Sequence, residues 1–238
     1  MKLALVLLFL VSCSSSPILP THSPVRAELP ASATASFLIA PGSRVRGSQS
    51  DAAAPLDKTP YESKTYVARL SYEGRGLPWS SHYIEVGPDS PLDLGFKLQP
   101  YGSDGSSFKV LLQFHVGMVL SPTDVEARNI QGAPKKTRSG LITGWDWSGV
   151  FAIGYRFSPL WLSSLGVRRS AFSLHHNFSE GIDDEWTVNG QQLVYFFDQG
   201  VDFSSWKIDL SLFYGGIGLA SADPALKFGM AAKVGFGW

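Results

Sequence analysis

The last fifteen residues of the chain alternate between apolar side chains and small or cationic ones. From Pro224 to Trp238 the sequence reads P-A-L-K-F-G-M-A-A-K-V-G-F-G-W. Because a β-strand points successive side chains to opposite faces, one face of this segment is apolar throughout. A soluble sandwich would bury that face against a second sheet, whereas a barrel in a membrane presents it to lipid. The pattern therefore predicts the final strand of a transmembrane β-barrel.

Seven earlier segments alternate in the same manner and are separated by turn-rich breaks. They cover residues 79–86, 92–98, 108–120, 138–157, 164–178, 186–197 and 204–220. With the last segment they predict an all-β, antiparallel transmembrane barrel of eight strands over residues 79–238, and eight is an allowed, even number. Residues 66–72 alternate too, so we interpret residues 64–78 as a lead-in or plugging strand. A barrel of ten strands is the alternative.

An even number of strands places both ends of the barrel on one side of the membrane, which we expect to be the periplasmic side. Four tryptophans fall at strand ends on that side, namely Trp79, Trp161, Trp206 and Trp238. Trp186 falls near an outer end, as expected for two interfacial girdles of aromatic residues. The largest outer loops are then residues 121–137 and 177–185, where we expect any extracellular ligand to bind.

Composition favours a membrane barrel over a nucleic-acid-binding protein. Charged residues make up 17% of the 238-residue chain, whereas about a quarter of the residues of a typical soluble domain are charged. The formal net charge is zero, so no basic surface and no nucleic-acid partner are predicted. No apolar run approaches the roughly 18 residues of a transmembrane helix. A membrane protein without such a run has to cross the bilayer as a closed barrel.

The N-terminus has the layout of an export signal. Residues 1–12 contain one lysine and then an apolar run that is too short to span a membrane. The run ends in Leu10-Val11-Ser12-Cys13, which resembles the lipobox of bacterial lipoproteins. The resemblance implies cleavage before Cys13 and lipidation of Cys13, and the alternative is ordinary cleavage near Ser16. Residues 13–63, rich in Ser, Ala, Pro and Thr, are predicted to be a disordered periplasmic tether.

The C-terminus carries a second resemblance. A final alternating strand that ends in Phe236 and Trp238 resembles the assembly signal of bacterial outer-membrane β-barrels. The resemblance implies a protein of the outer membrane of a diderm bacterium. It also implies that outer-membrane lipids and the barrel-assembly machinery are its partners.

The predicted interior of the barrel is charged. The positions expected to point inward include Glu85, Asp93, Lys97, Lys109, Asp146, Arg156, Lys207, Asp209, Lys227 and Lys233. Eight strands enclose a lumen that side chains can fill, and buried charges are costly unless they pair. We therefore expect a plugged structural core rather than a pore for solutes.

One stretch, residues 173–185, combines histidines with hydroxyls and carboxylates. His175 or His176 could activate Ser179 or Ser173 as a nucleophile. The stretch has a local resemblance to outer-membrane lipid A deacylases and the outer-membrane phospholipase, which carry a His-x-Ser-Asn sequence. Here His176 and Ser179 are three positions apart and point to opposite faces of a regular strand, and Ser173 and His175 stand in the reverse order. These departures favour interfacial side chains over a catalytic site.

No cofactor or metal site is predicted from the sequence. His175 and His176 are adjacent and project to opposite faces, and the acidic run at Asp183, Asp184 and Glu185 lacks the spacing of a calcium loop. The sequence thus predicts an outer-membrane β-barrel lipoprotein with a structural or surface-binding role. The alternatives are an outer-leaflet acyl hydrolase acting on lipid A or phospholipid, and a soluble β-sandwich lipoprotein.

Overall fold

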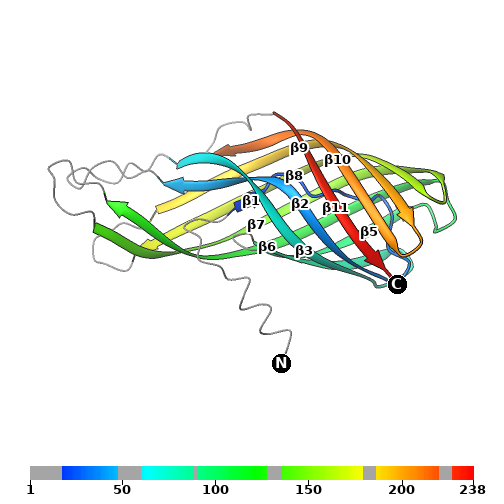
Figure 1. Cartoon of the computed structure of the whole chain (residues 1–238), viewed down its shortest axis with the longest axis horizontal. Coiled ribbons are helices and arrows are strands. Elements are labelled where there is room, and N and C mark those ends of the chain that lie inside the picture. Colours follow the sequence, from blue (N-terminus) through cyan, green and yellow to red (C-terminus); the bar gives the residue numbers. More distant parts are fainter. Residues whose placement is uncertain (1–17, 48–59, 88–90, 128–135, 179–185, 220–226) are drawn as a thin grey trace, which may run out of the picture.

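The chain folds as a closed, antiparallel barrel of ten strands with one additional short strand (Figure 1). The computed structural model describes residues 18–47, 60–87, 91–127, 136–178, 186–219 and 227–238. No helix within these ranges is long and apolar enough to cross a membrane. The strands are β1 (Ile18–Pro20), β2 (Ala33–Gly47), β3 (Pro60–Arg75), β4 (Ser80–Val86), β5 (Leu92–Tyr101), β6 (Phe108–Ala127), β7 (Lys136–Ser158), β8 (Trp161–Phe178), β9 (Trp186–Phe203), β10 (Trp206–Leu219) and β11 (Lys227–Gly237).

Each strand from β2 to β11 pairs with its neighbours in sequence, and β11 closes the barrel on β2. At the closing seam, Gly237 pairs with Thr34 and Ala232 pairs with Ile39. The C-terminal residue completes this end, because the Trp238 amide donates to the Ala33 carbonyl at 3.1 Å. The prediction of an all-β antiparallel barrel is confirmed.

The eight-strand prediction is wrong, and the ten-strand alternative is right. All eight predicted segments are strands, and the two additional strands are β2 and β3. β2 lies within residues 13–63, for which a tether was expected, and β3 overlaps residues 64–78, for which a lead-in strand was expected. Among residues 33–43 of β2, whose side chains are described, Phe37 and Ile39 are the large exposed apolar ones, while Leu38 and Ala40 face inward. A barrel strand needs apolar side chains on one face only. Because the other face of β2 carries small and polar residues, the average composition of β2 resembles that of a linker.

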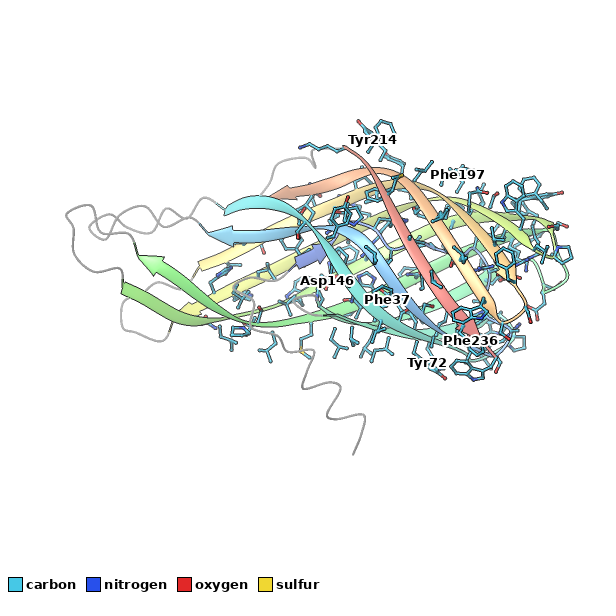
Figure 2. All side chains as sticks on the ribbon, viewed as in Figure 1. Phe37, Tyr72, Asp146, Phe197, Tyr214 and Phe236 are labelled. Atoms are coloured by element: carbon cyan, nitrogen blue, oxygen red, sulfur yellow. The ribbon has the colours of Figure 1, made fainter. Side chains whose placement is uncertain are left out.

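Because side chains alternate along each strand, the outer face of the wall is mostly apolar, and the inner face carries most of the buried charged and polar residues. Large apolar side chains cover the outside, and Phe37, Tyr72, Phe197, Tyr214 and Phe236 mark this surface in Figure 2. Of the charges predicted to point inward, Glu85, Asp93, Lys97, Lys109, Asp146 and Asp209 are buried, and Arg156, Lys207 and Lys233 are partly buried. Lys227 is exposed instead, because β11 pairs with β2 only from Ala232 onward and its first residues lie at the rim.

Inward aromatic rings lie over glycines on neighbouring strands. Tyr83 covers Gly95, Phe172 covers Gly190, Phe196 covers Gly166 and Phe213 covers Gly229, each at or next to a cross-strand pair. A Cβ atom at any of these glycines would overlap the ring. Glycine therefore makes room for large rings inside a narrow barrel.

The two ends of the barrel differ in the length of their connections. At the end that holds the C-terminus the turns are short, and the two-residue turn from Phe203 to Trp206 places Ser204 at a positive φ of 55°. The four tryptophans expected at one end lie there and are exposed. At the opposite end, β6 continues to Ala127 and β7 begins at Lys136, so much of the predicted loop 121–137 is strand. Most of the predicted loop 177–185 lies outside the described residues.

Residues 18–30 run through the interior of the barrel, and we call them the N-terminal plug. β11 pairs with residues 34–39 of β2, and the same edge of β2 is free of β11 beyond Ile39. β1 pairs with residues 42–44 on that part of the edge. The chain then crosses the lumen, where Leu19, Val25, Ala27 and Leu29 are buried among wall residues. Residues 64–78, expected as a possible plug, form part of the wall. A ten-stranded barrel is wider than an eight-stranded one, and the plug fills the additional space.

Candidate functional site

The plug is fixed by ion pairs near the C-terminal end of the barrel. Arg26 binds Asp209 at 2.9 Å and Asp202 at 2.7 Å. Glu28 binds Lys109 at 2.6 Å and also binds Arg156. We call these six residues, with the Arg156–Asp202 pair at 3.0 Å, the plug network. Such closely spaced partners offset the cost of bringing charges into a narrow lumen.

The plug charges are set by these partners. Burial by itself would raise the pKa of Glu28, but hydrogen bonds and charge from Arg156 and Lys109 hold it below its ordinary value. Burial would lower the pKa of Arg26, and the carboxylates of Asp209 and Asp202 raise it overall. Glu28 and Arg26 are therefore both charged at neutral pH.

The backbone of the plug is also bonded to the wall. The amide of Val25 donates to Asp198, that of Ala27 donates to Ser164 Oγ at 3.0 Å, and that of Leu29 donates to Gln99 Oε1 at 3.3 Å. His22 stacks on the ring of Phe196, with centroids 4.7 Å apart. Wall side chains thus replace the water that an irregular segment would otherwise need.

Two cavities lie between the plug and the wall in the described part of the barrel. A cavity of about 190 Å³ lies among the plug network, Lys207 and Lys233. A second cavity of about 20 Å³ lies between residues 23–25 and the facing wall. Since a water molecule needs roughly 10–15 Å³ of such volume, the smaller cavity holds about one water.

A buried ion cluster faces the smaller cavity. Arg69 binds Asp93 at 2.7 Å and Glu85 at 3.2 Å, and its side chain is 1% exposed. Its guanidinium also donates to the carbonyls of Glu85 and Pro91. A guanidinium with several partners stabilises two carboxylates that would otherwise repel each other.

Next to this cluster, Asp146, His115 and Ser148 form a chain of hydrogen bonds. Nε2 of His115 lies 3.0 Å from Asp146 Oδ2, and Nδ1 lies 2.9 Å from Ser148 Oγ. A carboxylate, an imidazole and a hydroxyl in this order can activate a nucleophile. Ser148 is only 2% exposed, however, and the nearby cavity of about 20 Å³ leaves no room for an ester substrate. The chain of bonds therefore orients the imidazole in the lumen wall.

The residues predicted as a hydrolase site lie on different faces of β8. His175 is exposed and its Nδ1 is 2.9 Å from Thr187 Oγ1, whereas His176 is buried. Ser173 has the same parity as His175 but is buried, and no hydrogen bond joins the two in the described part of the chain. Ser179 lies outside the described residues. An acyl hydrolase therefore stays a prediction.

Two predicted signals lie near the termini of the chain, at Cys13 and at Phe236 and Trp238. Cys13 lies outside the described residues, so its lipidation stays a prediction. Phe236 and Trp238 are exposed on the outer surface, and the Phe236 ring lies 5.4 Å from that of Trp206. Their role as an assembly signal stays a prediction.

Comparison with known proteins finds no family model and no curated sequence that matches this chain.

Sequence reasoning missed the plug network and the arrangement around His115. Alternation placed Asp93 and Asp146 inward, but which inward residues are neighbours depends on the strand register. For the plug, the one available signal was the charged pair Arg26 and Glu28 within a segment otherwise poor in charge.

Substituting Glu28 by glutamine is expected to loosen the plug. Lys109, which is fully buried, and Arg156 would lose a charged partner, and hydrogen bonds of this kind contribute about 1.5–3 kcal/mol. Amide hydrogen exchange of residues 25–29 should become faster in the variant. Asp104→Asn, which affects a solvent-exposed pair with Arg75, is the control and should leave that exchange unchanged.

Lowering the pH should also loosen the plug of the native protein, because it protonates Glu28. Because the pKa of Glu28 is lowered by folding, its contribution is complete above the ordinary carboxylate pKa and is lost as the pH falls through the lowered value. Protection of the plug amides, taken relative to their intrinsic exchange rates, should fall over that window in the native protein, and it should fall less in Glu28→Gln, where only Asp202 and Asp209 of the plug network still titrate. Equal pH profiles would contradict the assigned role of Glu28.

Proposed function

We propose that this protein is a plugged outer-membrane β-barrel lipoprotein with a structural or surface-binding role in a diderm bacterium. The observation that carries the proposal is the contrast between the apolar outer face and the charged interior of the barrel. Large apolar and aromatic side chains lie outside, and ion pairs and a peptide plug lie inside.

The outer surface supports a lipid environment. Every strand from β2 to β11 carries exposed large apolar side chains. They include Leu94, Phe96, Phe114, Val116, Met118, Leu120, Phe151, Phe197, Leu210, Leu212 and Val234. A soluble protein rarely exposes a continuous apolar area of this extent, because water would favour its burial. A soluble β-sandwich would bury these side chains between two sheets, so the fold counts against that alternative.

The plug supports a role other than solute diffusion. Residues 18–30 are held by ion pairs and by backbone hydrogen bonds along the lumen. A segment fixed at this many points occupies much of the lumen, which favours a closed barrel over an open pore. The function is then carried by the outer surface of the barrel or by its ends.

The two ends suggest how the protein sits in the membrane. We assign the end with short turns and exposed tryptophans to the periplasmic side, with outer-membrane lipids around the wall. Phe236 and Trp238 at that end would engage the barrel-assembly machinery. Residues 121–137 and 177–185, predicted as outer loops, would meet any extracellular ligand, and Cys13 would carry the lipid.

Conductance of single proteins in a planar bilayer tests the proposed closed state. The native protein should not conduct, whereas a variant lacking residues 18–30 should open a pore, because ten strands without a plug enclose an aqueous lumen. Circular dichroism checks that the variant still forms a barrel. If the deletion prevents folding, the double variant Arg26→Ala, Glu28→Ala should conduct intermittently. A native protein that conducts steadily would contradict the proposal.

A further inference from the structure

Three neighbouring strands bring two carboxylates to one point of the lumen wall. Asp93 on β5 is paired with Gly117 on β6, and Gly117 is paired with Asp146 on β7. The two aspartates therefore flank the glycine, and a Cβ atom at Gly117 would overlap Oδ1 of both. Glycine leaves a space that these two oxygens share.

Neither of these Oδ1 atoms has a hydrogen-bond partner among the described residues. Asp93 is 2% exposed and Asp146 is 8% exposed, so water does not solvate them freely. Their other oxygens are bonded, that of Asp93 to Arg69 at 2.7 Å and that of Asp146 to His115 Nε2 at 3.0 Å. Two buried, unpaired carboxylate oxygens over one space are costly unless a cation lies between them.

The imidazole of His115 offers a third donor at the same place. One ligand atom from each of Asp93, His115 and Asp146 lies within 4.8 Å of the others. We propose that these three residues bind one divalent transition-metal ion over Gly117. An imidazole nitrogen with two carboxylate oxygens is a donor set that suits Zn²⁺ and its first-row neighbours.

The surrounding residues fit the outer shell of such a site. With Nε2 of His115 on the metal, its Nδ1–H donates to Ser148 Oγ, which lies 2.9 Å away, and Arg69 holds the second oxygen of Asp93. Outer partners of this kind fix the ring and the carboxylate of a metal site. Ligand bonds of about 2.0–2.2 Å require the three donors to close together slightly. Arg168, whose Nη2 is 3.5 Å from His115 Nε2, has to turn away.

The ion would stabilise the wall that faces the plug. Asp93, His115 and Arg168 line the small cavity together with residues 23–25 of the plug. A metal ion there joins β5, β6 and β7 at one point. The site goes beyond the proposed function and does not depend on it, because all three ligands lie inside the barrel.

Titration of the full-length protein in detergent with Co²⁺ and Zn²⁺, after removal of metals by a chelator, tests the site. We expect one ion per chain, with visible absorption from bound Co²⁺ that Zn²⁺ displaces. Asp93→Asn, Asp146→Asn and His115→Gln should each weaken binding by at least about tenfold. Asp198→Asn removes another buried carboxylate that contacts the plug, and this control should bind as the native protein does.

Two results would overturn the proposal. Equal affinity in the native protein and in the three ligand variants would mean that the ion binds elsewhere. Absence of binding, with an infrared band of a protonated carboxyl group that disappears in Asp146→Asn, would mean that the two aspartates share a proton. Circular dichroism of each variant separates loss of binding from loss of the fold.

Discussion

Replacing Arg69 by alanine is expected to lower the free energy of unfolding by about 3–5 kcal/mol, because it leaves buried carboxylates without their cation. Arg69 is 1% exposed and lies 2.7 Å from Asp93 and 3.2 Å from Glu85. Its loss would also remove the donors for the carbonyls of Glu85 and Pro91. Unfolding by urea in detergent micelles, followed by tryptophan fluorescence, measures the change.

Lys227→Ala provides the control for Arg69→Ala. Lys227 is an exposed cation at the rim of the barrel, at the start of β11. Its removal should change stability by no more than about 0.5 kcal/mol. In the double variant Arg69→Met, Asp93→Asn the loss should be smaller than the sum of the two single losses, because the two groups act as a pair. Equal effects of Arg69→Ala and Lys227→Ala would contradict the buried pair.

Much of the barrel could be predicted from alternation alone. The eight segments from Trp79 to the C-terminus were all correct, because their outward side chains are mostly large and apolar and many of their inward ones are polar or small. β2 was missed because Ser36 and Ala40 face the lumen and Pro41 and Gly42 interrupt the pattern. The alternation around Phe37 and Ile39 was the available signal, and it was too short to outweigh the linker-like composition.

The interior could be predicted only in part. Parity shows which residues point inward, and it placed Asp93, Lys109 and Asp146 correctly. It does not show which of them touch, because contacts between strands depend on register and on the closure of the barrel. Asp93 and Asp146 are 53 positions apart in the chain and meet only because Gly117 pairs with both.

The plug lay beyond prediction from periodicity. Residues 21–30 have no regular secondary structure, so no repeating pattern distinguishes them from a linker. Their position follows from partners far away in sequence, such as Asp202 for Arg26 and Lys109 for Glu28. Only the folded barrel brings these partners together.

Replacing Leu212 by arginine is the second substitution with a large expected effect. Leu212 lies near the middle of β10 and is 56% exposed on the outer face. In a membrane barrel an arginine facing lipid at the midplane costs about 2–4 kcal/mol, and near an interface it costs about 0–1 kcal/mol. Leu77 is similarly exposed, at 52%, and lies in the turn between β3 and β4. Leu77→Arg is therefore the matched control.

The difference in stability between Leu212→Arg and Leu77→Arg, measured by urea unfolding from phospholipid vesicles, tests most directly whether the outer face of the barrel lies in lipid. We expect Leu212→Arg to lose at least about 2 kcal/mol more than Leu77→Arg. If water surrounded the barrel, both would be surface substitutions with effects within about 0.5 kcal/mol of zero. Equal, small losses in the two variants would contradict a membrane-embedded barrel.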